Sequence, residues 1–175
     1  MEKKYIIDNI SIARDYMNRF SLLLSDDKIL FDCCYLPPFK WKAFYAQFYK
    51  KTDSYYANCA YTYYSDINNI NSYSVSFSSI EEYNKHPAKK GDIICKIVPL
   101  RQEYVLNLIS LISEYVVEDS DDSLKGIILD GDYLKIRIFK NGSLLRDIDI
   151  DYGEKSIIKE AFAEFTLKYL NNTVE

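Results

Sequence analysis

The sequence predicts an α+β fold: one domain, residues 1–175, whose largely antiparallel sheet packs with at least four helices. Three observations support this prediction. The length of 175 residues is typical of a single domain. Glycine and proline are scarce, at five and four residues, so long irregular stretches are not expected. Stretches with apolar residues at helical spacing alternate with stretches of period two, which is typical of mixed α+β proteins.

The N-terminal third is expected to contain two helices and a strand. Residues 6–24 repeat apolar side chains at helical spacing, and the apolar run Ile29–Tyr35 predicts a strand. Pro37 and Pro38 would end that strand and open a second helix, because proline is favoured at the first helical position. This helix is expected to direct four rings to one side: Trp41, Phe44, Tyr45 and Phe48.

The middle of the chain predicts strands on either side of a short helix. Residues 55–64 alternate with period two and carry rings on both faces, and residues 73–77 alternate again. Ser78–Glu81 has the spacing of a capping box, which predicts a short helix. Ile93–Val98 predicts a further strand, and Pro99 is expected to open a second long helix. The apolar face of that helix would be formed by Val105, Leu108, Ile109, Ile112 and Val116.

The C-terminal third predicts a three-stranded antiparallel meander and a final helix. The strands are expected over Leu124–Asp130, Tyr133–Phe139 and Ser143–Ile150. Asp151 and Glu154 are expected to cap the helix. Its buried side would carry Ile158, Phe162, Phe165 and Tyr169.

Asn141 and Gly142 mark the turn between the last two strands, and the loop length sets the register of the hairpin. A two-residue loop would place Ile136 opposite Asp147. A three-residue loop, 140–142, instead pairs apolar residues with each other and Lys135 with Asp147. We therefore expect the longer loop, with Gly142 in the left-handed conformation.

Charge and cysteine usage narrow the class of protein. The net charge is −4, but residues 1–100 carry +2 and residues 101–175 carry −6, so the chain is dipolar. The four cysteines have no CxxC spacing, which favours free thiols in a reducing cytoplasm. No N-terminal signal pattern and no apolar run long enough to cross a bilayer is present, so a cytoplasmic location is expected.

Few residues suggest catalysis. His86 is the only histidine and lies in a lysine-rich turn before a proline, where packing would not orient it as a general base. Phosphate-binding glycine motifs do not occur in the sequence. Asp147, Asp149 and Asp151 would share one face of a strand and could bind a divalent cation, but Lys135 on the neighbouring strand would neutralise that face. We therefore expect neither a cofactor nor a metal, and no enzyme activity.

Residues 35–64 combine twelve aromatic residues with four lysines and one acid, Asp53. Twelve rings exceed what one face of a helix and one face of a strand usually bury, so this window is expected to form part of the core and part of a recognition surface.

These features favour a non-catalytic macromolecule-binding protein, of the inhibitor or immunity type, that masks a basic enzyme such as a nuclease toxin. Acidic side chains would attract the partner and mimic phosphate. Two alternatives stay open: a single-stranded nucleic-acid-binding protein using residues 35–64, and a metal-dependent enzyme using the three aspartates. The residues predicted to bind the partner are Glu118, Asp119, Asp121, Asp122, Asp147, Asp149, Asp151, Trp41, Tyr45 and Tyr49.

Overall fold

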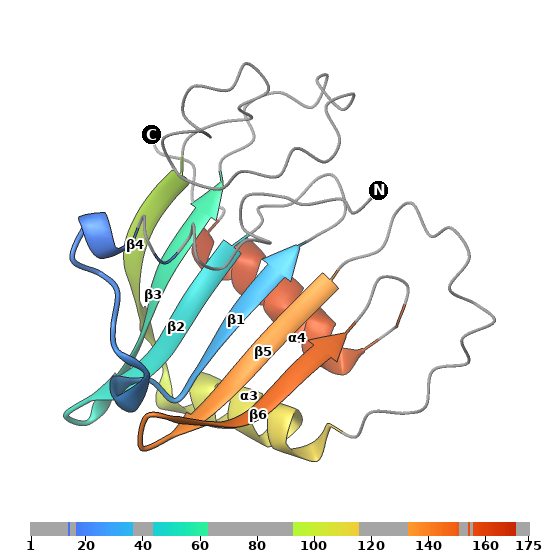
Figure 1. The fold of residues 1–175 in the computed structure, drawn as a ribbon. Helices are drawn as coiled ribbons and strands as arrows, with labels where there is room; N and C mark the ends of the chain where they lie inside the picture. The colour runs from blue at the N-terminus through green and yellow to red at the C-terminus, as the bar shows by residue number, and fades with distance from the viewer. Residues whose placement is uncertain are drawn as a thin grey trace, which may run out of the picture.

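The computed structural model describes residues 14, 17–36, 44–62, 93–115, 133–150, 154 and 156–170. Within these ranges a six-stranded antiparallel sheet has the strand order β4-β3-β2-β1-β5-β6. Helices α3 and α4 lie along one face of this sheet (Figure 1). We call that face the inner face and the opposite one the outer face.

The strands are β1 (Phe31–Leu36), β2 (Phe44–Lys51), β3 (Ser54–Thr62), β4 (Ile93–Leu100), β5 (Tyr133–Lys140) and β6 (Ser143–Ile150). The helical segments are the 3-10 turn η1 (Asp26–Lys28), α3 (Gln102–Glu114), α4 (Ile157–Phe165) and the π-helical turn η3 (Thr166–Leu170), which continues α4.

The apolar core lies between the inner face and the two helices. Phe44 and Phe48, two residues apart on β2, point to the same side because strand side chains alternate. Phe162 and Phe165 of α4 pack on them, with ring centroids 5.3–6.4 Å apart. Each fully buried ring contributes roughly 1.5–3 kcal/mol through the area removed from water.

The two long helices follow their predicted apolar faces. Val105, Leu108 and Ile112 of α3 are buried at helical spacing. Ile158, Phe162 and Phe165 of α4 are buried in the same way. In the part of the chain that the structure describes, no helix has both the length and the apolar character that a bilayer-spanning segment needs.

Two details of these helices differ from expectation. The N-cap of α4 is Ser156, whose hydroxyl accepts a hydrogen bond from the Ile158 amide at 3.2 Å. Glu154 instead accepts a hydrogen bond from the Tyr115 hydroxyl at 2.7 Å. Pro99 belongs to β4, at an end of the strand order where a missing amide is tolerated, and α3 begins at Gln102.

The prediction of at least four helices is wrong: over the described ranges, only α3 and α4 have seven or more residues. The helix expected after Pro37 and Pro38 is replaced, from Phe44 onward, by strand β2. Both faces of this strand are buried from Phe44 to Phe48, so its apolar residues are not confined to alternate positions. Tyr45 and Phe48 would share one side of a helix but lie on opposite faces of the strand.

The predicted C-terminal meander is wrong in its first strand pairing, whereas its strands Tyr133–Phe139 and Ser143–Ile150 are confirmed as β5 and β6. Strand β5 pairs with β1 on one edge and with β6 on the other, so both of its edges are occupied. Residues 124–130, expected to pair with β5, lie outside the described residues. The central sheet thus joins segments distant in sequence, since β1 and β5 are about one hundred residues apart.

The remaining elements divide into confirmed strands and untested segments. The strands predicted over Ile29–Tyr35, from Tyr55 and from Ile93 are confirmed as β1, β3 and β4. In the helix predicted over residues 6–24, the described residues Arg14 and Met17–Arg19 are helical, and the chain leaves the helix at Phe20. The strand over residues 73–77 and the short helix after Ser78 lie outside the described residues.

The β5–β6 hairpin has a two-residue loop, so the expected three-residue loop is wrong. Asn141 and Gly142 both have positive φ, 51° and 80°, as a type I′ turn requires. Lys140 pairs with Ser143, and a bulge then shifts the register, so that Ile136 pairs with Ile148. The bulge therefore brings the apolar residues into register, and no longer loop is needed.

The turn gives a test of this geometry. Gly142→Val should lower the free energy of unfolding by about 1–2 kcal/mol, because a β-branched residue at positive φ clashes with its own backbone. Ser143→Val, one residue later in extended β6, is the matched control and should change stability by less than about 0.5 kcal/mol. Chemical denaturation of both variants measures the difference. Equal stabilities of the two variants would contradict the left-handed conformation of Gly142.

Candidate functional site

The outer face of the sheet carries a row of polar side chains across five neighbouring strands. The strand register aligns Asp147 of β6, Arg137 of β5, Asp32 of β1, Gln47 of β2 and Asn58 of β3. We call this set the outer row. Three of its members, Asp32, Gln47 and Asn58, are buried although they are polar. Buried polar groups require partners, so the contacts of this row determine what it can do.

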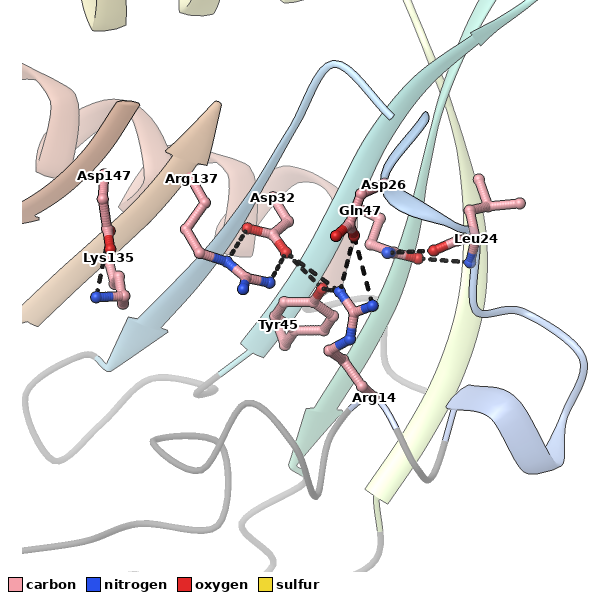
Figure 2. Close-up of polar contacts among 9 residues, drawn as sticks. All are labelled: Arg14, Leu24, Asp26, Asp32, Tyr45, Gln47, Lys135, Arg137 and Asp147. Carbon is pink, nitrogen blue, oxygen red and sulfur yellow. Dashed lines mark hydrogen bonds and ion pairs between the residues drawn. The ribbon is translucent and has the colours of Figure 1, made fainter. Parts of the chain in front are cut away.

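Asp32 is the centre of the outer row and is only 1% exposed. Its carboxylate accepts two hydrogen bonds from Arg137, from Nε at 2.9 Å and from Nη2 (Figure 2). The Tyr45 hydroxyl donates a third hydrogen bond at 2.6 Å. Arg14 Nη1 lies 3.8 Å from the same carboxylate. The hydrogen bonds to Asp32 raise the pKa of Arg137, so this guanidinium stays charged.

Arg14 connects this cluster to the N-terminal segment. Its guanidinium donates to the Tyr45 hydroxyl at 3.2 Å and pairs with Asp26 at 3.4 Å. Two arginines thus face two aspartates, and the four charges balance. While Arg14 is in place, this balanced cluster has no net charge with which to attract an ionic ligand, and its geometry fits a structural role.

Tyr45, which the sequence analysis assigned to partner binding, is fully buried. Burial and the nearby charge of Asp32 raise the pKa of its phenol. Because no part of its ring is exposed, Tyr45 offers no surface to a partner. Its role is to satisfy Asp32.

The main chain of the N-terminal segment is bound by the other two buried members of the outer row. Gln47 donates from Nε2 to the Leu24 carbonyl and accepts from the Leu24 amide, both at 2.9 Å. Asn58 donates from Nδ2 to the Leu22 carbonyl at 2.7 Å. These amides therefore bind the main chain of the N-terminal segment over the outer face, and Figure 2 shows the pair of Gln47 and Leu24.

The sequence analysis missed Asp32, Gln47 and Asn58. The signal for Asp32 was its position inside the apolar run from Phe31 to Tyr35, where a charged residue needs a partner.

Asp147 and Asp149, which we call the aspartate ladder, are both paired with Lys135. The Lys135 ammonium lies 3.2 Å from a carboxylate oxygen of Asp147 and 3.2 Å from one of Asp149, and the Tyr133 hydroxyl donates to Asp149. Burial acts to lower the pKa of Lys135, but the hydrogen bonds to Asp149 and Asp147 outweigh it and raise the pKa. The ammonium occupies the place between the two carboxylates that a cation would take. No group of three potential metal ligands occurs among the described residues.

Most of the rings that the structure describes within residues 35–64 contribute to the core. Tyr35, Phe44, Phe48, Tyr55 and Tyr61 are all buried on the inner face. On the outer face, Tyr49 and Tyr56 are half-buried and stack on each other, with centroids 5.6 Å apart and planes 24° apart. Each ring thus covers part of the other, which leaves less aromatic surface for stacking on bases.

Tyr49 keeps some exposure, unlike Tyr45, the other predicted aromatic contact that the structure describes. Its hydroxyl donates to the Asn58 side chain at 3.0 Å, which fixes the orientation of the amide that holds Leu22.

Strand β6 carries an exposed apolar pair that the sequence analysis also missed. Leu144 and Leu145 are 53% and 65% exposed. Leu145 is the bulged residue, without a cross-strand partner, and Leu144 directly precedes it. On the same strand, the side chains of Asp147 and Asp149 are 41% and 49% exposed. In the strand order of the described sheet, β6 is a terminal strand.

The other predicted contacts lie outside the described residues: Trp41, Glu118, Asp119, Asp121, Asp122 and Asp151. Their proximity to β6 therefore stays a prediction.

Compared with family models, with curated proteins and with solved structures, the chain gives no significant match.

The raised pKa of Tyr45 gives a testable pH dependence. At neutral pH, Tyr45→Phe should lower stability by about 1.5–3 kcal/mol, because it removes a hydrogen bond to a charged group. In the unfolded chain the phenol ionises near pH 10, whereas the folded state keeps it neutral. The stabilisation is therefore present below pH 10 and is lost as the pH rises above it.

The difference in stability between wild type and Tyr45→Phe should accordingly shrink by up to about 1.4 kcal/mol per pH unit above pH 10. Urea denaturation of both proteins between neutral pH and pH 11 measures it. A difference that stays constant over this range would show that Tyr45 is not held neutral at Asp32.

Proposed function

We propose that this protein is a non-catalytic inhibitor or immunity-type protein of the cytoplasm, which masks a basic partner enzyme, such as a nuclease toxin, through strand β6. The observation that carries the proposal is the composition of this strand. It places two exposed leucines beside two half-exposed carboxylates on a terminal strand of the described sheet.

The two parts of this surface support different steps of binding. Asp147 and Asp149 share the positive charge of Lys135, so the ladder keeps an excess of negative charge. Exposed negative charge accelerates encounter with a basic partner. Leu144 and Leu145 supply apolar area, which stabilises the complex after encounter. An apolar centre beside charged residues is typical of a protein interface.

The alternatives receive less support from the described residues. Nucleic-acid binding through residues 35–64 requires exposed rings, and most of the rings that the structure describes there are in the core. A metal site at the aspartates requires free carboxylates, and Lys135 pairs with Asp147 and Asp149.

The cysteines fit the proposed compartment. None of the four cysteines forms a disulfide bond. Burial raises the pKa of Cys33 and Cys59, and it raises the pKa of Cys95 to about 11. These thiols are therefore protonated at neutral pH and act as small apolar residues, and free thiols are typical of a reducing compartment.

Charge reversal on β6 tests the proposal. A variant combining Asp147→Lys and Asp149→Lys should fold normally, because solvent-exposed charges contribute little to stability. It should associate with its basic partner at least about tenfold more slowly at low salt, and the difference should shrink as the salt concentration rises. The matched control combines Glu160→Lys and Glu164→Lys on the exposed side of α4, and it changes the net charge equally.

The partner is first captured from an extract of the host with the wild-type protein, and association and dissociation rates are then measured for each variant. Leu144→Ser with Leu145→Ser should mainly accelerate dissociation. Equal effects of the β6 and α4 charge variants would show that only net charge matters. If the captured partner associates with and dissociates from the β6 variants at the wild-type rates, β6 is excluded as the binding surface.

A further inference from the structure

The N-terminal segment crosses the outer face as a strap, which we define as Arg14 and residues 17–26. It is held by three sets of polar contacts: Arg14 with Asp32 and Tyr45, Gln47 with the main chain of Leu24, and Asn58 with the carbonyl of Leu22. Figure 2 shows Arg14 and Leu24 reaching this face from the same side of the sheet.

The amide contacts recognise backbone rather than side chains. Gln47 and Asn58 are cross-strand partners on β2 and β3, so they lie about 5 Å apart. Leu22 and Leu24 are alternate residues, as in an extended chain. Gln47 bonds both the N–H and the C=O of Leu24, as a neighbouring β-strand would. These groups would hold any extended segment of suitable length.

Among the described residues, the strap shares few apolar contacts with the core. The core cluster of the described residues contains no strap residue. Met17 is buried, but Phe20 is 57% exposed, and Leu22, Leu23 and Leu24 are only half-buried. Segments with few buried apolar contacts open at lower free energy than the core.

The backbone of the strap contains a strained turn. The Leu22 amide donates to the Met17 carbonyl at 2.9 Å, and the Ser21 amide donates to the Asn18 carbonyl at 3.0 Å. This is the Schellman pattern that ends a helix, and it places Ser21 at φ 57°, where glycine is preferred. Opening of the strap would allow Ser21 to leave this disfavoured conformation.

We propose that the strap is a displaceable cover, and that its opening uncovers a binding site for an extended peptide that carries an arginine. The incoming backbone would replace Leu22 and Leu24 on Asn58 and Gln47, and its guanidinium would replace Arg14 at Asp32. The Arg137–Asp32 pair joins β5 to β1 and involves no strap residue, so opening of the strap would leave this part of the site in place. This inference does not depend on the proposed role of β6.

Native-state hydrogen exchange of the full wild-type chain tests the opening. The Leu24 amide, bonded to Gln47, should exchange at least about tenfold faster than the amides of β1 and β2. Its exchange rate should increase with denaturant, but less steeply than that of the sheet amides. If the Leu24 amide exchanges only when the whole protein unfolds, the proposal is overturned. Exchange independent of denaturant would also overturn it, because it would indicate local fluctuation without opening.

A labelled peptide with the sequence of residues 14–27 tests the uncovered site. Arg14→Ala in the full chain weakens the strap, so this variant should bind the peptide at least about tenfold more tightly than wild type. Arg101→Ala, at the start of α3, is the matched control and should bind like wild type. A peptide N-methylated at the residue equivalent to Leu24 lacks the donor for Gln47 and should not bind. Equal affinity of both peptides, or no binding to Arg14→Ala, would overturn the proposal.

Discussion

The burial of the Asp32 carboxylate in the central strand β1 is the constraint on which the arrangement of this sheet depends. An unpaired buried carboxylate would cost several kcal/mol, so its partners must be in place. Arg137 lies directly opposite on β5, and Tyr45 reaches it from β2. A shift of one residue in either pairing would turn these side chains to the inner face. The carboxylate therefore fixes the register of three strands, and through Arg14 it also positions the strap.

The two faces of the sheet consequently have different chemistry. The inner face is apolar and packs on α3 and α4, which provides most of the hydrophobic stabilisation. The outer face is polar, and its buried groups are bound by one another and by the main chain of the strap. The charged groups left with substantial exposure on this face include Asp147 and Asp149 of β6. For this reason we assign partner binding to the terminal strand and peptide binding to the face beneath the strap.

Sequence patterns predicted the buried faces of α3 and α4 and the strands β1, β3 and β4, but they failed for strand β2. The faces of α3 and α4 were predicted from the spacing of Val105, Leu108, Ile112, Phe162 and Phe165. Strand β2 was mistaken for a helix because Tyr45 is buried on the face opposite Phe44 and Phe48. The hairpin register depended on a bulge that composition does not reveal. The ladder of Asp147 and Asp149 with Lys135 was predicted from alternation, whereas the partners of Asp32 lie 13 and 105 residues away.

The central claim is that Asp32 and Arg137 depend on each other, and a double-mutant cycle tests it most directly. The free energy of unfolding is measured for wild type, Asp32→Asn, Arg137→Gln and the double variant. We predict a coupling energy of about 2–3 kcal/mol, since each single change leaves a buried polar partner unsatisfied. Single effects that add within about 0.5 kcal/mol would contradict the account, because the two side chains would then contribute independently.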